Sequence, residues 1–223
     1  MPDHLRKNGY IIRPYRRGDR QAVRDICAAT CWMGEYRPEL IGDDWLWAEY
    51  WTRYFTDVEP RHTWIVQRTI DGEVLGYLTG TVDERRFFRY AWRIMPGIVA
   101  HVTRRRLVRN PVARRAILSM LRAMMLDKSC PEAILREFPA TWHFDLLPEG
   151  RRMRAGFELV RTFLNRMKAL GIAGVHGEPL SLNRGVGVFL RRLGFHLAHS
   201  RATRAFAHVE QQPVAIETWV KKL

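Results

Sequence analysis

The sequence predicts a single α/β domain built around a mixed sheet. Strand-like and helix-like patterns alternate along most of its 223 residues, a length that suits one domain with a substantial core. Hydrophobic residues make up 47% of the chain, which excludes a disordered protein. The clearest alternation runs from Thr141 to Phe195, in the order strand, basic turn, helix, strand, asparagine, helix and Gly-Phe.

The N-terminal part begins with a strand and a helix. Tyr10–Pro14 is a short apolar strand that proline stops, and the next helix places Val23, Ile26 and Cys27 on one face. Asp19 stands directly before this helix, where a carboxylate side chain can accept a hydrogen bond from a free backbone N–H. We therefore expect Asp19 to cap the helix.

A second helix and a hairpin follow. The helix begins at Asp43 or Asp44, ends near Phe55 and is dense in aromatic residues, of which most are expected in the core and one or two beside a site. The acidic residues at its start are expected to act as caps, with attraction of a cationic amine as the alternative. Residues 62–68 and 73–82 then read as two strands joined by a turn at Asp71-Gly72.

The composition changes between residues 85 and 126, which contain eleven arginines and no acidic residue. Pro96-Gly97 and Asn110-Pro111 are expected to divide this stretch into helical pieces, the clearest at 112–126. We interpret residues 84–138, approximately, as a basic helical insertion within the single domain 1–223. A short helix at 131–137 leads from it into the strand Thr141–Leu147.

The segment 150–156, Gly-Arg-Arg-Met-Arg-Ala-Gly, is a basic turn that opens a helix over 157–170. Free N–H groups and the positive end of a helix dipole make such a turn a binding site for phosphate. The arginines at 151, 152 and 154 add charge-assisted contacts. A solvated basic helix start is the alternative, and the preceding apolar strand argues against it.

These motifs together resemble those of the GCN5-related N-acetyltransferases. Arg151-x-x-Arg154-x-Gly156 resembles the family's phosphate turn, Gln/Arg-x-x-Gly-x-Gly/Ala, with Arg154 in place of the first glycine. His143-Phe-Asp-Leu-Leu-Pro-Glu149 is most similar to the acetyltransferase-like domains related to the C-terminal part of O-GlcNAc hydrolases. Asn183, Phe189 and the final Gly-Phe also fit, whereas Leu190 occupies the position of the family's tyrosine. The resemblance implies a GNAT-like acyl-CoA N-acyltransferase fold that ends in a hairpin over 196–201 and 206–219.

The resemblance also implies acetyl-CoA as the co-substrate. Two splayed strands would hold pantetheine against the strand 141–147, and the amides of 151–156 would surround the pyrophosphate. The residues expected to contact acetyl-CoA are Leu146, Leu147, Arg151, Arg152, Met153, Arg154, Ala155, Gly156, Asn183 and Phe189. The implied activity is direct acetyl transfer, in a ternary complex, to a small-molecule or peptide amine.

Four residues are candidates for acid–base chemistry. Alternation along the strand puts His143 and Asp145 on one face, and a carboxylate in an apolar sheet is costly unless it is used or paired. Asp145 is therefore the first candidate for the general base, and a structural carboxylate beside His143 is an equal alternative. His176 and Glu178 on the adjoining strand rank second, because a lone strand histidine is commonly a core residue.

The net charge of +14 predicts attraction to polyanions. For the insertion, a solvated face, an anionic membrane surface and a homodimer contact all remain open, and nucleic acid is disfavoured because no binding motif accompanies it. Cys27, Cys31 and Cys130 read as free thiols with no metal site. The polar N-terminus predicts a cytoplasmic protein, with peripheral membrane attachment as a variant.

Two alternatives to an active acetyltransferase remain open. Leu190 cannot protonate a departing thiolate as a tyrosine does, so one alternative is a catalytically degenerate pseudo-acetyltransferase that acts as a binding module. The other is a basic adaptor associated with membrane or nucleic acid, which the arginine-rich insertion favours.

Overall fold

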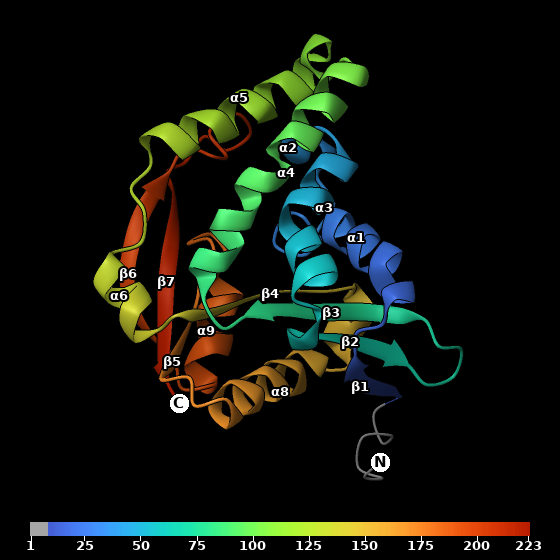
Figure 1. Ribbon diagram of the computed structural model, residues 1–223, viewed down its shortest axis with the longest axis vertical. Coiled ribbons are helices and arrows are strands. Elements are labelled where there is room, and N and C mark those ends of the chain that lie inside the picture. The colour runs from blue at the N-terminus through green and yellow to red at the C-terminus, as the bar shows by residue number, and fades with distance from the viewer. Residues whose placement is uncertain (1–8) are drawn as a thin grey trace.

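A computed structural model describes residues 9–223 as a mixed seven-stranded sheet with helices on both faces (Figure 1). The strand order is β1-β2-β3-β4-β5-β7-β6, and every neighbouring pair is antiparallel except β4–β5. The strands are β1 (Tyr10–Pro14), β2 (Thr63–Arg68), β3 (Val74–Thr81), β4 (Ala140–Leu146), β5 (Gly174–Gly177), β6 (His196–Thr203) and β7 (Val214–Lys222). This architecture confirms the predicted α/β class.

Helices pack on the two faces of the sheet according to the alternation of its side chains. The helices are α1 (Arg20–Ala29), α2 (Pro38–Ile41), α3 (Asp44–Arg53), α4 (Glu84–Arg104), α5 (Pro111–Leu126), α6 (Glu132–Glu137), α7 (Pro148–Arg152), α8 (Ala155–Ala169) and α9 (Arg184–Arg192). Shorter helical turns are Arg17–Asp19, Tyr54–Val58, Pro60–His62 and Leu107–Arg109. On one face, Ile65 and Tyr77 pack under α1 and α3. On the other, Trp64 and Leu78 pack against α8. Each strand therefore contributes to two cores.

The insertion between β3 and β4 begins with α4, which does not break at Pro96 as expected. Proline removes one helical N–H, but buried Phe87, Ile94 and His101 recur along one face of α4 on both sides of it. Arg106 then turns the chain in the left-handed region with φ +52°, and Asn110 caps α5 by accepting from the amide of Val112 at 2.9 Å. Packing on both sides of Pro96 explains why the predicted break is absent.

We call residues 84–126, comprising α4, α5 and their connection, the arm. The two helices meet away from the sheet, at the top of Figure 1. From there α5 runs back past the loop after β6, and Ser119 Oγ, in the middle of α5, donates to the carbonyl oxygen of Arg204 in that loop at 2.8 Å. Among residues 9–223, no helix combines the length and apolar character needed to cross a bilayer.

Asp19 precedes α1 as predicted, but its side chain does not cap that helix. Both carboxylate oxygens instead accept from the Arg13 guanidinium at 2.7 Å, and one also accepts from the Arg16 amide. A bidentate charged pair is stronger than a cap to a neutral amide. The ion pair explains why Asp19 is engaged elsewhere.

Candidate active site

Strands β4 and β5 separate soon after they begin. Their pairing covers only Ala140 with Val175 and Thr141 with His176, so the rest of β4 has no partner on that side among the described residues. The Leu147 amide donates to the carbonyl oxygen of Leu75 at 2.9 Å. Since alternate residues direct their backbone groups to opposite neighbours, those of Leu146 point into the gap. The structure thus corrects the prediction for the Leu147 amide, which β3 already binds.

One wall of the gap is apolar and closely packed. A side-chain carbon at Gly156 would lie 3.3 Å from Leu146 Cδ1 and 3.7 Å from Phe189 Cε2, so glycine lets α8 approach β4 closely. The Phe189 ring lies 4.6 Å from the Phe157 ring and 5.8 Å from the Phe144 ring. The structure therefore brings the predicted residues Leu146, Gly156 and Phe189 together.

The basic turn is more helical than expected, because α7 occupies 148–152. The amides of Arg151, Met153 and Arg154 donate to carbonyl oxygens within this turn at 3.0–3.1 Å. The amides of Ala155 and Gly156, at the start of α8, have no acceptor among residues 9–223. Of the amides over 151–156 that were predicted to bind phosphate, these two are therefore the free donors.

The cationic side chains of the turn differ in their surroundings. Arg152 and Arg154 are exposed, and neither has a carboxylate within ion-pair distance in the described chain. Arg154 has φ +60°, in the left-handed region that favours the glycine of the family pattern. The Arg151 guanidinium instead lies against Gly34, where a side-chain carbon would be 1.7 Å from Nη1. Met153 packs against the core below α8.

Asp145 and His143 form a polar cluster with Tyr77 on the face of β4 that carries α1. Tyr77 Oη donates to Asp145 Oδ2 at 2.6 Å and lies 3.3 Å from His143 Nδ1. His143 Nε2 is 3.6 Å from Asp145 Oδ2, and its ring stacks on Trp51 at 5.6 Å. The side chains of His143 and Asp145 are 31% and 16% exposed, so the cluster is open to solvent at one side.

The protonation of this cluster follows from its burial. Burial raises the pKa of Asp145, although His143 and Tyr77 oppose this effect. Burial and the Asp145 charge raise the pKa of Tyr77 well above its usual value. Tyr77 therefore remains the proton donor to Asp145, and Asp145 holds a proton more readily than an exposed carboxylate.

The second-ranked acid–base candidates, His176 and Glu178, are both held by other groups of the fold. His176 is fully buried, with Nδ1 2.6 Å from the carbonyl oxygen of Phe138 and Nε2 3.3 Å from Glu84 Oε1. Burial lowers the pKa of His176, but Glu84 more than offsets that effect and the net direction is upward. Both Glu178 oxygens accept from Arg201 at 2.7 Å, and although burial opposes it, Arg201 lowers the pKa of Glu178. Both groups therefore hold structural contacts.

Other predicted residues have local structural roles. Asn183 caps α9, accepting from the amide of Val186 at 3.4 Å, and Leu190 is 2% exposed in the core. Asp43 caps α3, with Oδ1 2.8 Å from the Leu46 amide and 3.1 Å from His101 Nε2. These contacts support the capping interpretation of Asp43.

Trp51 lies on the aromatic helix of which one or two residues were expected beside a site. Two other residues at this cluster, Tyr77 and Cys27, were not predicted as site residues. Cys27 is fully buried, and its sulfur lies within 4.8 Å of a donor atom of both His143 and Asp145. Alternation along β3 puts Tyr77 on one face of the sheet, and apolar spacing puts Cys27 on the buried side of α1. Only the tertiary structure shows that α1 packs on this face of the sheet, beside His143 and Asp145.

Comparisons with known proteins find similar structures but no similar family model or curated sequence. No protein-family model and no curated protein sequence matches the chain. The protein in the crystal structure of SsHAT shares 26% sequence identity with this chain, and the two structures match with a TM-score of 0.67 over 96% of this chain and 98% of that chain. The polyamine N-acetyltransferase of Drosophila melanogaster, which forms N-acetylagmatine, is 15% identical, with a TM-score of 0.59 over 96% and 100% of the two chains. A GCN5-related N-acetyltransferase from Kribbella flavida is 15% identical, with a TM-score of 0.57 over 96% and 98%.

The comparisons decide the fold and leave the narrower likeness open. None of these three is described as a relative of O-GlcNAc hydrolases, so that part of the resemblance stays a prediction. From its strand order, its divided β4–β5 pair and these neighbours, the chain has the fold of the GCN5-related N-acetyltransferases.

Proposed function

We propose that this chain is an acetyl-CoA-dependent N-acetyltransferase that transfers acetyl directly to a small-molecule or peptide amine in a ternary complex. The observation that carries the proposal is the position of Asp145 on β4, the strand whose free edge lines the β4–β5 gap. Neighbours of the same fold include enzymes described as acting on polyamines and on agmatine, which supports an amine acceptor.

The residues around the gap fit acetyl-CoA, which supplies the activated acetyl thioester when bound. The free edge of β4 offers Leu146 backbone groups to an extended chain such as pantetheine. The free amides of Ala155 and Gly156 stand at the positive end of α8 and suit a pyrophosphate. Arg152 and Arg154 add positive charge, and Phe189 with its neighbouring rings supplies an apolar wall.

Asp145 is the group that can accept the amine proton. Tyr77 holds Asp145 Oδ2 through a 2.6 Å hydrogen bond, which fixes the orientation of the carboxylate. An ammonium group approaching Asp145 would also be attracted by its charge before losing a proton. Trp51 and His143 form the aromatic side of this approach.

The burial of Leu190 favours a second candidate, a binding module with little or no turnover. Leu190 stands where the family pattern has a proton-donating tyrosine, and its core packing leaves no hydroxyl there to protonate a leaving thiolate. A thiolate is a stable leaving group, so we expect slow turnover under the first proposal and none under the second.

The substitution Asp145→Asn tests the proposal because it removes the base and keeps the shape. We expect kcat to fall about 10²–10⁴-fold with acetyl-CoA affinity nearly unchanged. Calorimetry gives the affinity, and CoA release over an amine library gives the rate. Because burial raises the pKa of Asp145, the acidic limb of the wild-type rate profile should lie above the usual range of an aspartate and vanish in the variant.

Each contrary result identifies a different error. A wild-type protein that does not bind acetyl-CoA would refute the acetyltransferase proposal. Binding without CoA release for any amine supports the binding module. Full activity of Asp145→Asn, with loss in Glu178→Gln, would make Glu178, just after β5, the base.

A further inference from the structure

Three side chains that can each donate a ligand atom to a metal ion lie close together beneath α1. Acetyl transfer does not require the three of them as a set. Cys27 comes from α1, and His143 and Asp145 come from β4. One donor atom from each, sulfur, nitrogen and oxygen, lies within 4.8 Å of the other two. We propose that Cys27, His143 and Asp145 form a binding site for a divalent cation of the zinc class.

The donor spacing is close to what such an ion needs. Zinc bonds of about 2.3 Å to sulfur and about 2.0–2.2 Å to nitrogen and oxygen place tetrahedral ligands about 3.3–3.6 Å apart. His143 Nε2 and Asp145 Oδ2 are already 3.6 Å apart. The Cys27 sulfur lies within 4.8 Å of the other two donor atoms, so the set has to contract by at most about 1.5 Å to reach this spacing.

Tyr77 orients the imidazole and the carboxylate in the way that a metal requires. Its hydroxyl hydrogen goes to Asp145 Oδ2 at 2.6 Å, so Tyr77 Oη can accept from His143 Nδ1 at 3.3 Å. A proton on Nδ1 leaves the lone pair on Nε2, the nitrogen nearer to the carboxylate. This tautomer is assigned from the hydrogen-bond network. Outer hydrogen bonds of this kind fix the ligands of metal sites.

The donor set and its exposure define the kind of ion. A thiolate and an imidazole favour zinc, cobalt or cadmium over magnesium or calcium, which prefer oxygen ligands. With the thiol proton released, the charges of Cys27 and Asp145 balance a divalent ion. Cys27 is fully buried while His143 is 31% exposed, so an ion enters beside His143 and keeps water as its fourth ligand.

Metal binding and acetyl transfer would compete for Asp145, a consequence that rests on the proposed function. A carboxylate bound to a cation cannot accept an amine proton at the same time. Zinc is therefore expected to inhibit transfer, and removing the Cys27 ligand is expected to relieve the inhibition. The binding measurement itself needs neither acetyl-CoA nor an amine.

Cobalt(II) is the probe, because its thiolate complexes absorb in the near ultraviolet and the band reports sulfur ligation directly. Titration of the whole protein with Co²⁺ should give this band at one equivalent, and added Zn²⁺ should remove it. Cys27→Ser should abolish the band. Cys31→Ser, in the turn just after α1, is the matched control and should keep it. Tyr77→Phe should weaken metal binding about 10–100-fold while retaining the band at saturation.

The outcomes separate cleanly. The proposal is overturned if the folded wild-type protein gives no thiolate band, or if the band survives Cys27→Ser. If Cys27→Ser does not fold, the partly exposed ligand variant His143→Gln serves instead, and unchanged affinity in that variant overturns the site. A failed acetyltransferase assay leaves the absorption result unaffected.

Discussion

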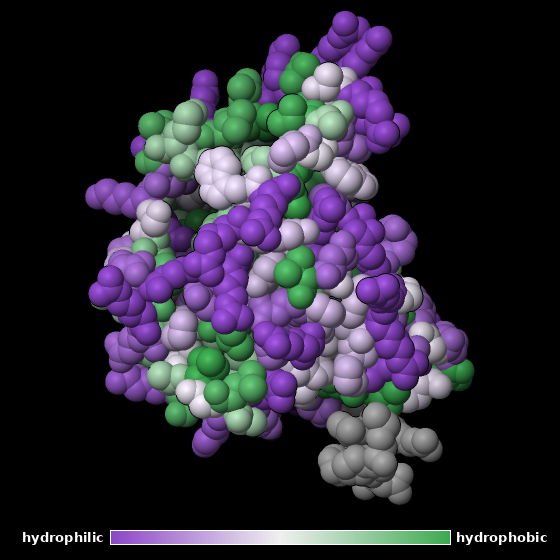
Figure 2. Space-filling view, viewed as in Figure 1, coloured by the Kyte–Doolittle hydropathy of each residue, from purple (hydrophilic) through white to green (hydrophobic). Residues whose placement is uncertain are grey.

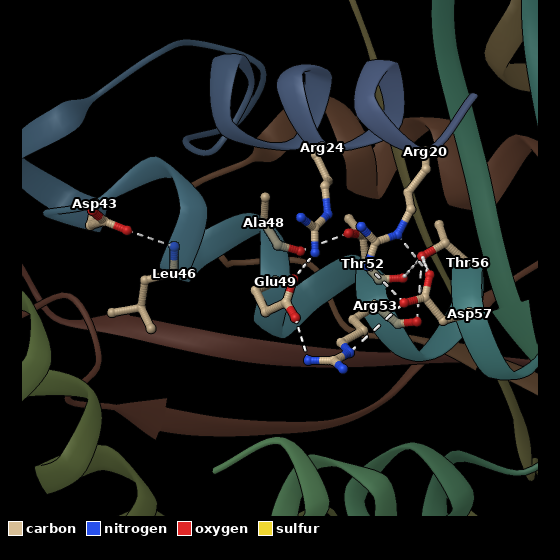
Figure 3. Close-up of polar contacts among 10 residues, drawn as sticks. All are labelled: Arg20, Arg24, Asp43, Leu46, Ala48, Glu49, Thr52, Arg53, Thr56 and Asp57. Carbon is tan, nitrogen blue, oxygen red and sulfur yellow. Dashed lines mark hydrogen bonds and ion pairs between the residues drawn. The ribbon is translucent and has the colours of Figure 1, made fainter. Parts of the chain in front are cut away.

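The α1–α3 layer and the arm use arginine in opposite ways. Between α1 and α3, Arg24 and Arg53 both contact Glu49, and Arg20 pairs with Asp57 at 2.7 Å (Figure 3). Of the eleven arginines in the arm, only Arg85 and Arg86 have a carboxylate within 4.0 Å among residues 9–223. The other nine are thus available to anions outside the chain.

The difference depends on burial. Glu49 is 2% exposed and Arg24 is 9% exposed, so each would be a costly buried charge without the other. In the arm, exposed apolar side chains lie on the same helices as the unpaired arginines, and Figure 2 shows hydrophobic side chains over α5 beside hydrophilic ones. Stripes recur at helical spacing: Phe88, Trp92 and Val99 on α4, and Leu118, Leu121 and Met125 on α5. The same residue type therefore holds the fold in one region and remains unpartnered in the other.

Glu49→Gln should give the largest effect in this comparison. It leaves Arg24 buried without a countercharge, and such a loss typically costs about 3–5 kcal/mol of unfolding free energy. Urea denaturation measures the change. Arg24→Met with Glu49→Leu removes both charges and should cost much less. Asp57→Asn, in the more exposed pair, should cost at most about 1 kcal/mol.

Two outcomes would contradict the structural role of this pair. If Glu49→Gln is as mild as Asp57→Asn, the buried pair contributes no more than the exposed one. If the double replacement is as damaging as the single one, packing rather than an unpaired charge explains the loss.

Arginines of the arm should have a smaller effect, on lipid binding rather than on stability. The anionic membrane surface remains our prediction for the arm, because a contact between two arms would bring like charges together. Arg114→Gln with Arg122→Gln should weaken binding to anionic vesicles about 30-fold, at about 1 kcal/mol for each charge. Vesicle sedimentation measures this. Wild-type binding should fall steeply with added salt.

The matched control keeps the charge in the arm. Arg114→Lys with Arg122→Lys should bind nearly as the wild type does, and Arg161→Gln with Arg166→Gln on α8 should have little effect. Salt-insensitive binding, or equal binding to neutral vesicles, would refute the membrane prediction. A dimer that binds neither vesicle type would favour an oligomer contact.

Much of the fold could be predicted from the sequence because its signals are local. The strand patterns in 62–68 and 73–82 and the Asp71-Gly72 turn predicted a hairpin, and the structure has β2 and β3 there. The predicted break at Pro96 was wrong because distant packing on both sides of it holds α4 together. A rule about one residue fails where tertiary contacts outweigh it.

The candidate site could be predicted only in part, for the same reason. Asp145 and His143 share a face because strand alternation is local, and the structure places them together. Cys27 is more than a hundred positions away in sequence, and no spacing rule connects it to them. His176 ranked second from the sequence, and its contacts with Glu84 and Phe138 show it to be a core residue.

Arg154 should give the smallest effect, and its sign is the informative part. A φ of +60° costs a residue with a side chain roughly 1–2 kcal/mol. Glycine avoids this cost, but part of the benefit is lost because glycine gives the unfolded chain more conformational freedom. Arg154→Gly should therefore stabilise the protein by about 0.5–1 kcal/mol, seen as a higher melting temperature. Arg154→Ala removes the same charge but keeps the strain, so it should not stabilise. Both variants should bind acetyl-CoA more weakly if the Arg154 charge faces the phosphates. Equal stabilisation by alanine and glycine would show that backbone strain is not the cause. Unchanged affinity of both variants for acetyl-CoA would show that the Arg154 side chain, unlike the free amides beside it, has no part in binding the cofactor.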